Sequence, residues 1–244
     1  MTHEHTPLTR WDPASLAEVA DRFCDLKTPW WVAGGFAIEL AVGHRIRDHG
    51  DIDVLLLRRD QLAVQQALPD WKWWAVDPPG SLRPWVSGEA LPESVHDIWC
   101  QPAPGEPWRI QIMLDEAYDQ EWVSRRDPRV RRPIDTLGLI SADGIPYLAP
   151  EVQLFYKAKE PRPKDEADLD AVLPTLTDNQ RHWLVHASPR LTARIRGPTG
   201  CCGNPNDTIG DTPGIPNDPN SLASTQSDLI GRAGRLSATH RKFG

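Results

Sequence analysis

The alternation of apolar and polar residues predicts short helices and strands along the first half of the chain. Asp12 followed by Pro13 is typical of a helix start and predicts a helix that runs to about residue 25. The apolar residues 30–33 predict a short strand that leads into a glycine pair. Residues 36–42 then predict a short helix, and Gly43 stands where a helix C-terminus favours glycine.

The same pattern continues to about residue 187. It predicts a strand at residues 51–57 and a helix at residues 61–68. Residues 95–100 and 108–114 predict two strands joined as a hairpin through a loop rich in Pro and Gly. Three helices are expected at the end, beginning at Pro150 and continuing at residues 164–173 and 179–187. Together these elements predict an α+β fold, with a mixed α/β sheet and a small C-terminal helical cap.

Composition divides the chain at about residue 188. All eleven Trp residues precede residue 184, whereas residues 188–244 are rich in Gly and Pro and contain Phe243 as their single aromatic residue. A segment with so few apolar side chains cannot offset the entropy cost of ordering it, so we predict a disordered tail. The predicted parts are a core at residues 1–148, a cap at 149–187 and the tail at 188–244.

Charge and cysteine usage limit the class of protein. The formal net charge is −7, which argues against a general nucleic-acid-binding protein and makes a nucleic-acid partner unlikely. The sequence contains no apolar stretch long enough for a membrane span, and residues 1–5 do not resemble a secretory signal. Four Cys residues do not suggest a disulfide framework at this length. We therefore predict a cytoplasmic protein without a membrane partner.

The candidate chemistry lies between residues 34 and 54. Gly34 and Gly35, between a strand and a helix, allow backbone N–H groups to approach a ligand at the positive end of the helix dipole, as a phosphate site requires. Asp51 and Asp53 stand two residues apart on a predicted strand, so both carboxylates face the same side. Two such carboxylates repel each other unless a cation lies between them, and their oxygen atoms suit Mg²⁺.

These residues resemble those of a known superfamily. The glycine pair, a short helix, and then Arg47, His49, Asp51 and Asp53 at alternate positions before an apolar strand are similar to the DNA polymerase β-like nucleotidyltransferases. Within it, residues 30–54 resemble the aminoglycoside and lincosamide adenylyltransferases, and the resemblance extends over about residues 28–187.

The resemblance implies a nucleotidyltransferase fold and a transferase that binds ATP with magnesium, two Mg²⁺ ions being expected. Asp51 and Asp53 would hold metal, and attack on the α-phosphate would release pyrophosphate. Lys157 and Lys159 lie in a helix that resembles the family's cap, where a lysine contacts the triphosphate, and Lys157 is our candidate.

The family also requires a third carboxylate on a neighbouring strand, and the sequence offers two. Asp97 is the first candidate for this catalytic and metal-binding position, because it opens a predicted strand. Asp115 is the second, at what we expect to be a mobile strand end. If Gln111 instead occupies the family's acidic position, the protein lacks that acid and is inactive.

Several other polar residues could have either a functional or a structural role. Arg47 and His49 could contact phosphate or support Asp51. Glu39 is expected on a helix surface. Five arginines could contact an anionic acceptor or RNA, or could be a solvated loop: Arg125, Arg126, Arg129, Arg131 and Arg132. His96 and Cys100 have a spacing like that of a zinc site, but core packing is the better reading. Cys201 and Cys202 are not expected to bind metal.

The leading functional prediction is transfer of a nucleoside monophosphate, AMP from MgATP, to a hydroxyl of a small acceptor such as an aminoglycoside-like compound. This activity is associated with antibiotic resistance. The acidic net charge favours a cationic acceptor. The alternatives are a toxin-type nucleotidyltransferase that modifies protein or tRNA, and a degenerate domain that binds nucleotide without turnover.

Overall fold

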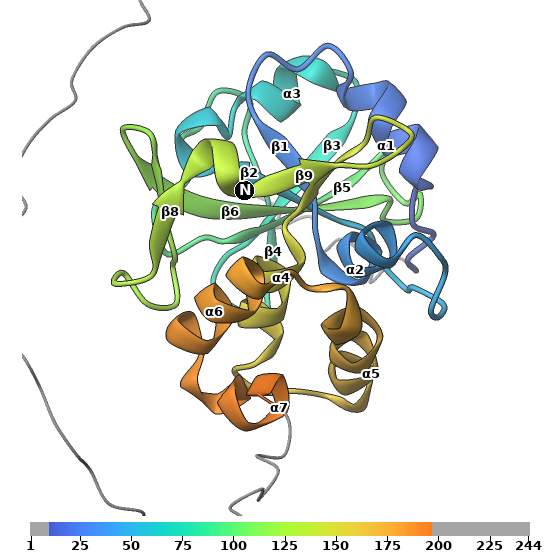
Figure 1. The fold of residues 1–244 in the computed structure, drawn as a ribbon. Coiled ribbons are helices and arrows are strands. Elements are labelled where there is room, and N and C mark those ends of the chain that lie inside the picture. The colour runs from blue at the N-terminus through green and yellow to red at the C-terminus, as the bar shows by residue number, and fades with distance from the viewer. Residues whose placement is uncertain (1–9, 197–244) are drawn as a thin grey trace, which may run out of the picture. The chain divides into compact units, whose positions relative to one another are not determined.

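The computed structural model describes residues 10–196, and these form one mixed sheet with helices on both sides (Figure 1). In chain order the strands are β1 (Trp30–Val32), β2 (Asp53–Leu57), β3 (Lys72–Val76), β4 (Leu82–Pro84), β5 (Asp97–Gln101), β6 (Ile110–Tyr118), β7 (Glu121–Val123), β8 (Arg131–Pro133), β9 (Gly138–Ile140) and β10 (Pro146–Leu148). Their order across the sheet is β4-β3-β5-β6-β2-β1-β10-β9, with β7 paired to β6 and β8 paired to β7. β2 runs parallel to β6 and β1 parallel to β10, whereas the remaining neighbours are antiparallel.

The helices divide between the two sides of the sheet. They are α1 (Leu16–Phe23), α2 (Gly34–Val42), α3 (Ala63–Ala67), α4 (Pro150–Lys157), α5 (Pro163–Val172), α6 (Asp178–Ala187) and α7 (Thr192–Arg196). Figure 1 shows α1 and α3 on one side, and α2 with the cap helices α4 to α7 on the other. Four 3-10 turns complete the regular structure: η1 (Arg58–Asp60), η2 (Ile134–Thr136), η3 (Leu173–Thr175) and η4 (Pro189–Leu191).

The core lies under the central strands. Val54 to Leu57 of β2 are fully buried, because helices cover both faces of this strand and exclude water from consecutive side chains. Trp108 and Trp122 are the largest fully buried side chains. The predicted α+β fold is therefore confirmed. Within residues 10–196, no helix is both long enough and apolar enough to cross a bilayer.

Several local predictions are corrected by the structure. The first helix begins after Ser15, which accepts a hydrogen bond from the Glu18 backbone, while Asp12 pairs with Arg109 instead of capping a helix. Strands β3 and β4 and the four short strands β7 to β10 were not expected. β4 and β7 to β10 are too short, at three residues each, to show a period of two, and β3 is a continuous apolar run after Lys72 that does not alternate.

The cap also extends further than the sequence indicates. Residues 188–196, which we expected to be disordered, contain η4 and α7. Ile195 of α7 is buried, and Arg194 pairs with Glu166 and Asp170 of α5. Residues 197–244, the rest of the predicted tail with Cys201 and Cys202, lie outside the described residues.

Candidate active site

The sheet brings the predicted carboxylates to one face. Asp53 opens β2 in register with Gln111 of β6, and Asp97 opens β5 in register with Met113 of the same strand. Gln111 and Met113 stand two positions apart and share a face, so Asp53 and Asp97 also share that face. Asp51 lies in the segment immediately before β2. The three aspartates therefore come together through three strands.

A cleft of about 510 Å³ lies between this face of the sheet and the cap. Its sheet side includes all three aspartates and the glycine pair. Its other lining residues come mainly from the cap and from the loop after β7: Arg125, Arg126, Gln153, Tyr156, Lys157, Lys159, Glu160, Arg162, Lys164 and Asp165. Of the predicted site residues, His49 and the second carboxylate candidate, Asp115, do not line this cleft, and the others do.

Asp53 is the carboxylate most affected by this arrangement. Burial, together with the negative charges of Asp51 and Asp97, raises the pKa of Asp53 to about 7. The positive charges of Lys157 and Lys164 act in the opposite direction but do not cancel the effect. A carboxyl group so close to other carboxylates is costly to ionise unless a cation shares the site.

The donor set fits a divalent cation without forming a closed metal site. Carboxylate oxygens are the ligands that Mg²⁺ prefers, and Asp51, Asp53 and Asp97 would supply them. In the described part of the chain, no three His, Cys, Asp or Glu side chains are grouped closely enough to hold a metal ion as they stand. Metal binding by these three residues stays a prediction.

The first glycine of the pair is required by a neighbouring side chain. Gly34 has φ +66°, and a Cβ atom placed on it would lie 2.2 Å from Oδ2 of Asp53. Its backbone N–H donates to Oε1 of Gln153 on α4, at 2.8 Å. This N–H is one of those at the start of α2 that have no partner within the helix, so the cap satisfies it. Gly34 therefore fixes both the approach of Asp53 and the contact with the cap.

The second glycine makes room for Arg47 and His49. A Cβ atom at Gly35 would lie 2.3 Å from Nη2 of Arg47 and 2.3 Å from Cε1 of His49. Arg47 Nη1 and His49 Nδ1 are 2.9 Å apart, and since arginine always donates, Nδ1 is the acceptor. The His49 proton is then on Nε2, which lies 2.9 Å from Oε1 of Glu39. The two residues thus fill the space that a larger residue at position 35 would need.

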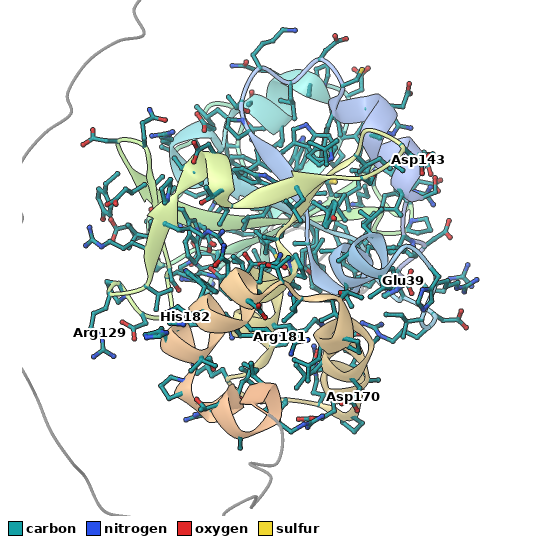
Figure 2. The ribbon with its side chains drawn as sticks, in the orientation of Figure 1. Glu39, Arg129, Asp143, Asp170, Arg181 and His182 are labelled. Carbon is teal, nitrogen blue, oxygen red and sulfur yellow. The ribbon has the colours of Figure 1, made fainter. Side chains whose placement is uncertain are left out.

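Glu39 of α2, labelled in Figure 2, is a buried residue, contrary to the expectation of a helix-surface residue. Its Oε1 accepts hydrogen bonds from the backbone N–H groups of Ile46 and Arg47, at 2.7 and 3.1 Å. Although burial acts to raise it, these bonds and His49 hold the pKa of Glu39 below its usual value. Glu39 therefore shapes the loop between α2 and β2, which delivers Asp51 to the cleft.

Lys157 and Arg47 both form ion pairs with the same aspartate of α5, Asp168. Arg47 donates from Nε and Nη2 to the two carboxylate oxygens of Asp168, both at 3.1 Å. Lys157 is half-buried, and its Nζ lies 2.8 Å from Asp168 Oδ2 and 2.8 Å from Asp165 Oδ1. Although burial acts to raise it, these donors lower the pKa of Asp168. Arg47 and Lys157, predicted to bind nucleotide, thus already have carboxylate partners.

The two candidates for the third carboxylate have different surroundings. Asp97 lines the cleft, where Gln111 Nε2 donates to its Oδ1 at 3.1 Å. Asp115 is fully buried in the middle of β6, not at a mobile strand end, and its Oδ2 accepts from Trp122 at 2.7 Å and from the Tyr156 hydroxyl. Burial raises the pKa of Asp115, and the Tyr156 and Arg125 contacts oppose this only in part. The geometry favours Asp97.

The structure also shows the surroundings of Gln111 and of His96 and Cys100, the pair with zinc-like spacing. Gln111 is on β6, between the strands of Asp53 and Asp97, and its side chain donates a hydrogen bond to Asp97. Although position 111 is not acidic, Asp97 gives the cleft a third carboxylate. Cys100 is fully buried with its Sγ against the Ile110 carbonyl, while His96 lies 3.2 Å from the Arg58 guanidinium. Their surroundings accord with the core-packing reading of His96 and Cys100.

The charge of the cleft differs from that of the chain. Seven of the side chains that line it are basic and five are acidic, although the formal net charge of the protein is −7. The acidic groups of the sheet side face a mainly basic cap side. The chain's net charge therefore does not support the prediction of a cationic acceptor.

Comparison with known proteins identifies a related family. Residues 15–77 match the model of the family described as aminoglycoside-2''-adenylyltransferase. No curated protein sequence matches the chain.

Similar solved structures include enzymes that adenylylate antibiotics. One is ANT(2'')-Ia in complex with adenylyl-2''-tobramycin, at 14% identity over 72% of this chain and 95% of that one, with a TM-score of 0.46. Another is the lincosamide antibiotic adenylyltransferase LnuA with lincomycin bound, at 17% identity over 68% and 100% of the two chains, with a TM-score of 0.48.

A third is an antigenic nucleotidyltransferase-like protein from Paracoccidioides brasiliensis, at 16% identity over 74% and 90%, with a TM-score of 0.39. The family match covers the segment that contains the glycine pair, Asp51 and Asp53. The predicted resemblance to the aminoglycoside adenylyltransferases is thereby confirmed over residues 15–77.

Proposed function

We propose that this protein is an adenylyltransferase that moves AMP from MgATP to a hydroxyl group of a small, antibiotic-like acceptor and releases pyrophosphate. The observation that carries the proposal is the sharing of one cleft by Asp51, Asp53 and Asp97 beside the glycine turn. The first two lie within the segment that matches an adenylyltransferase family. A reaction that uses ATP also accords with a cytoplasmic location.

Each group of residues has a role in this reaction. Mg²⁺ held by the three carboxylates would neutralise their charge and polarise the α-phosphate. Asp97 is the residue that receives the acceptor hydroxyl's proton, at Oδ2, because Gln111 already occupies Oδ1. Gln153 and Gly34 hold the start of α2 beside the cleft, and the buried pairs of Asp168 fix the cap above it.

The decisive experiment follows the label from α-phosphate-labelled ATP with Mg²⁺ and a panel of aminoglycosides and lincosamides. The proposal expects labelled antibiotic and stoichiometric pyrophosphate, both abolished in Asp53→Asn while circular dichroism shows an unchanged fold. Label on protein or tRNA would favour a toxin-type enzyme instead. ATP binding without any transfer would favour a degenerate domain, a reading that the presence of Asp97 in the cleft makes less attractive.

A further inference from the structure

Two consecutive arginines enter the candidate cleft from the loop after β7. Arg125 and Arg126 both line the cleft, and their guanidinium carbons lie 5.8 and 4.9 Å from the centre of the Tyr156 ring. Ser124 shapes the turn that carries them, because its Oγ accepts from the backbone N–H groups of Arg126 and Asp127, at 3.1 and 3.4 Å. The chain thus presents two like charges side by side on a locally fixed turn.

The other three arginines of this region, Arg129, Arg131 and Arg132, lie outside the cleft and have acidic partners. Arg132 pairs with the buried Glu151, and Arg131 lies 4.0 Å from Glu121. Arg129 pairs with Asp127 and points away from the protein (Figure 2). Only Arg125 and Arg126 of the five line the cleft.

The charge of this pair is only partly compensated. Arg125 Nε lies 3.2 Å from Asp115 Oδ1, but neither atom makes a hydrogen bond within the described residues. Asp115 is also shared with Tyr156 and Trp122. Arg126 donates to the Tyr156 carbonyl, which is neutral, and the exposed Glu160 is the other acidic group that acts on it. Burial and the neighbouring charge of Arg125 lower the pKa of Arg126, as expected for guanidinium groups that lack an anion.

The arginines enter the cleft beside β6, whereas the glycine pair lies at the end of β1. The glycines follow β1, and the order β1-β2-β6-β5 leads from them past Asp53 to Asp97. Arg125 contacts Asp115 of β6, and its charge acts on His96, the residue before Asp97. With the triphosphate at the glycine end, as the proposed function requires, the acceptor binds at the Asp97 end beside the two arginines.

We infer that Arg125 and Arg126 bind an anionic group of the acceptor, a carboxylate, phosphate or sulfate carried by the molecule whose hydroxyl is adenylylated. Paired guanidinium groups offer the planar donors that such anions prefer. The inference rests on the proposed function and narrows it, because it favours an acidic, hydroxyl-rich acceptor over a polycation.

Titration calorimetry with inorganic phosphate, in the presence of a saturating non-hydrolysable ATP analogue and Mg²⁺, tests this inference. The analogue blocks the triphosphate position, and the dependence of the remaining phosphate binding on Arg126 separates the arginine pair from the other basic residues of the cleft. We expect Arg126→Gln to weaken that binding by about tenfold or more. Arg129→Gln, in the same loop but outside the cleft, should leave it unchanged. The guanidinium of Arg126 packs against Tyr156, but the residue as a whole is exposed, so its replacement should not affect folding, which circular dichroism checks.

Three results would overturn the inference: no phosphate binding to the wild type, equal binding to Arg126→Gln, or displacement of phosphate by the ATP analogue. The last would assign the arginines to the triphosphate. The same titrations are repeated without the analogue, so phosphate binding and its dependence on Arg126 are also measured independently of nucleotide. Failure of the ATP analogue itself to bind would therefore count against the proposed function alone.

Discussion

At the scale of single residues, the closest constraint in the site is between Gly34 and Asp53. Gly34 has a positive φ, and the Asp53 carboxylate occupies the position that a side chain there would take. Gly43 also has a positive φ, +78°, but no atom lies within 4 Å of its missing side chain. Replacement of either glycine would strain the backbone, but only replacement of Gly34 would also displace the Asp53 carboxylate.

We expect Gly34→Ala to lower the transfer rate by about 100-fold or more, because small displacements of a reacting group cost that much. Gly43→Ala should cost about 1 kcal/mol of stability through its left-handed backbone and retain its rate. Steady-state rates and melting temperatures of both variants make the comparison. An equal loss of rate in the two variants would contradict the assignment.

The residue scale also shows what could be predicted from the sequence. Strand alternation predicted that Asp51 and Asp53 lie together, and the family resemblance made Asp97 a candidate beside them; all three line the cleft. The partners of Arg47 and Lys157 did not, because Asp168 stands 121 residues after Arg47 and no local pattern connects them. Glu39 was misjudged for a related reason, since its partners belong to an irregular loop.

At the scale of elements, Asp97 and Asp115 share a strand face, and the elements that cover each of them give them different tasks. Asp97 opens β5 toward the cleft, whereas Asp115 is enclosed between β6, β7 and α4 by Trp122 and Tyr156. Sequence periodicity gave both acids as candidates. Their burial depends on β7 and on the cap, which were not evident from the local pattern.

We predict that Asp97→Ala lowers kcat by about 100-fold or more with little change in melting temperature. Asp115→Ala leaves Tyr156 and Trp122 without their buried acceptor and Arg125 without its ion-pair partner. It should cost about 3 kcal/mol, or roughly 10 °C of melting temperature. Assays at saturating MgATP, below the melting point of each variant, separate the effects. A stable, inactive Asp115→Ala beside a fully active Asp97→Ala would reverse the assignment.

The final helix offers a second test at this scale. A chain that ends at Ala187 lacks α7 and the buried Ile195, whereas a chain that ends at Arg196 retains both. Burial of one such side chain contributes about 1.5–3 kcal/mol, so the shorter chain should melt several degrees lower. Scanning calorimetry of the two truncated proteins measures the difference, and equal melting temperatures would show that α7 contributes nothing.

At the scale of the whole described structure, core and cap are joined by buried charges. Asp168 of α5 binds Arg47 of the core and Lys157 of α4, and its pKa is lowered in the folded protein. A carboxyl group with a depressed folded pKa stabilises the fold above its unfolded pKa of about 4. That contribution is lost as the pH falls through the folded value.

Asp168→Asn should therefore cost about 2–4 kcal/mol near neutral pH. Between about pH 5 and pH 2, its melting temperature should fall less steeply than that of the wild type, because the variant has no such carboxylate to protonate. Asp170→Asn, two residues away on the same helix and paired with Arg194 at the surface, is the control and should change stability by less than about 1 kcal/mol. Parallel pH curves for wild type and Asp168→Asn would exclude the network as a source of stability.

The contact of Gln153 with Gly34 has a consequence for how such proteins can be recombined. A side chain of the cap completes the start of α2, and the cap lysine Lys157 shares Asp168 with Arg47 from the core. A cap transplanted from a relative would have to bring matching partners for both contacts. Exchange of acceptor preference between such proteins should therefore succeed through the loop after β7, which carries Arg125 and Arg126, sooner than through wholesale exchange of the cap.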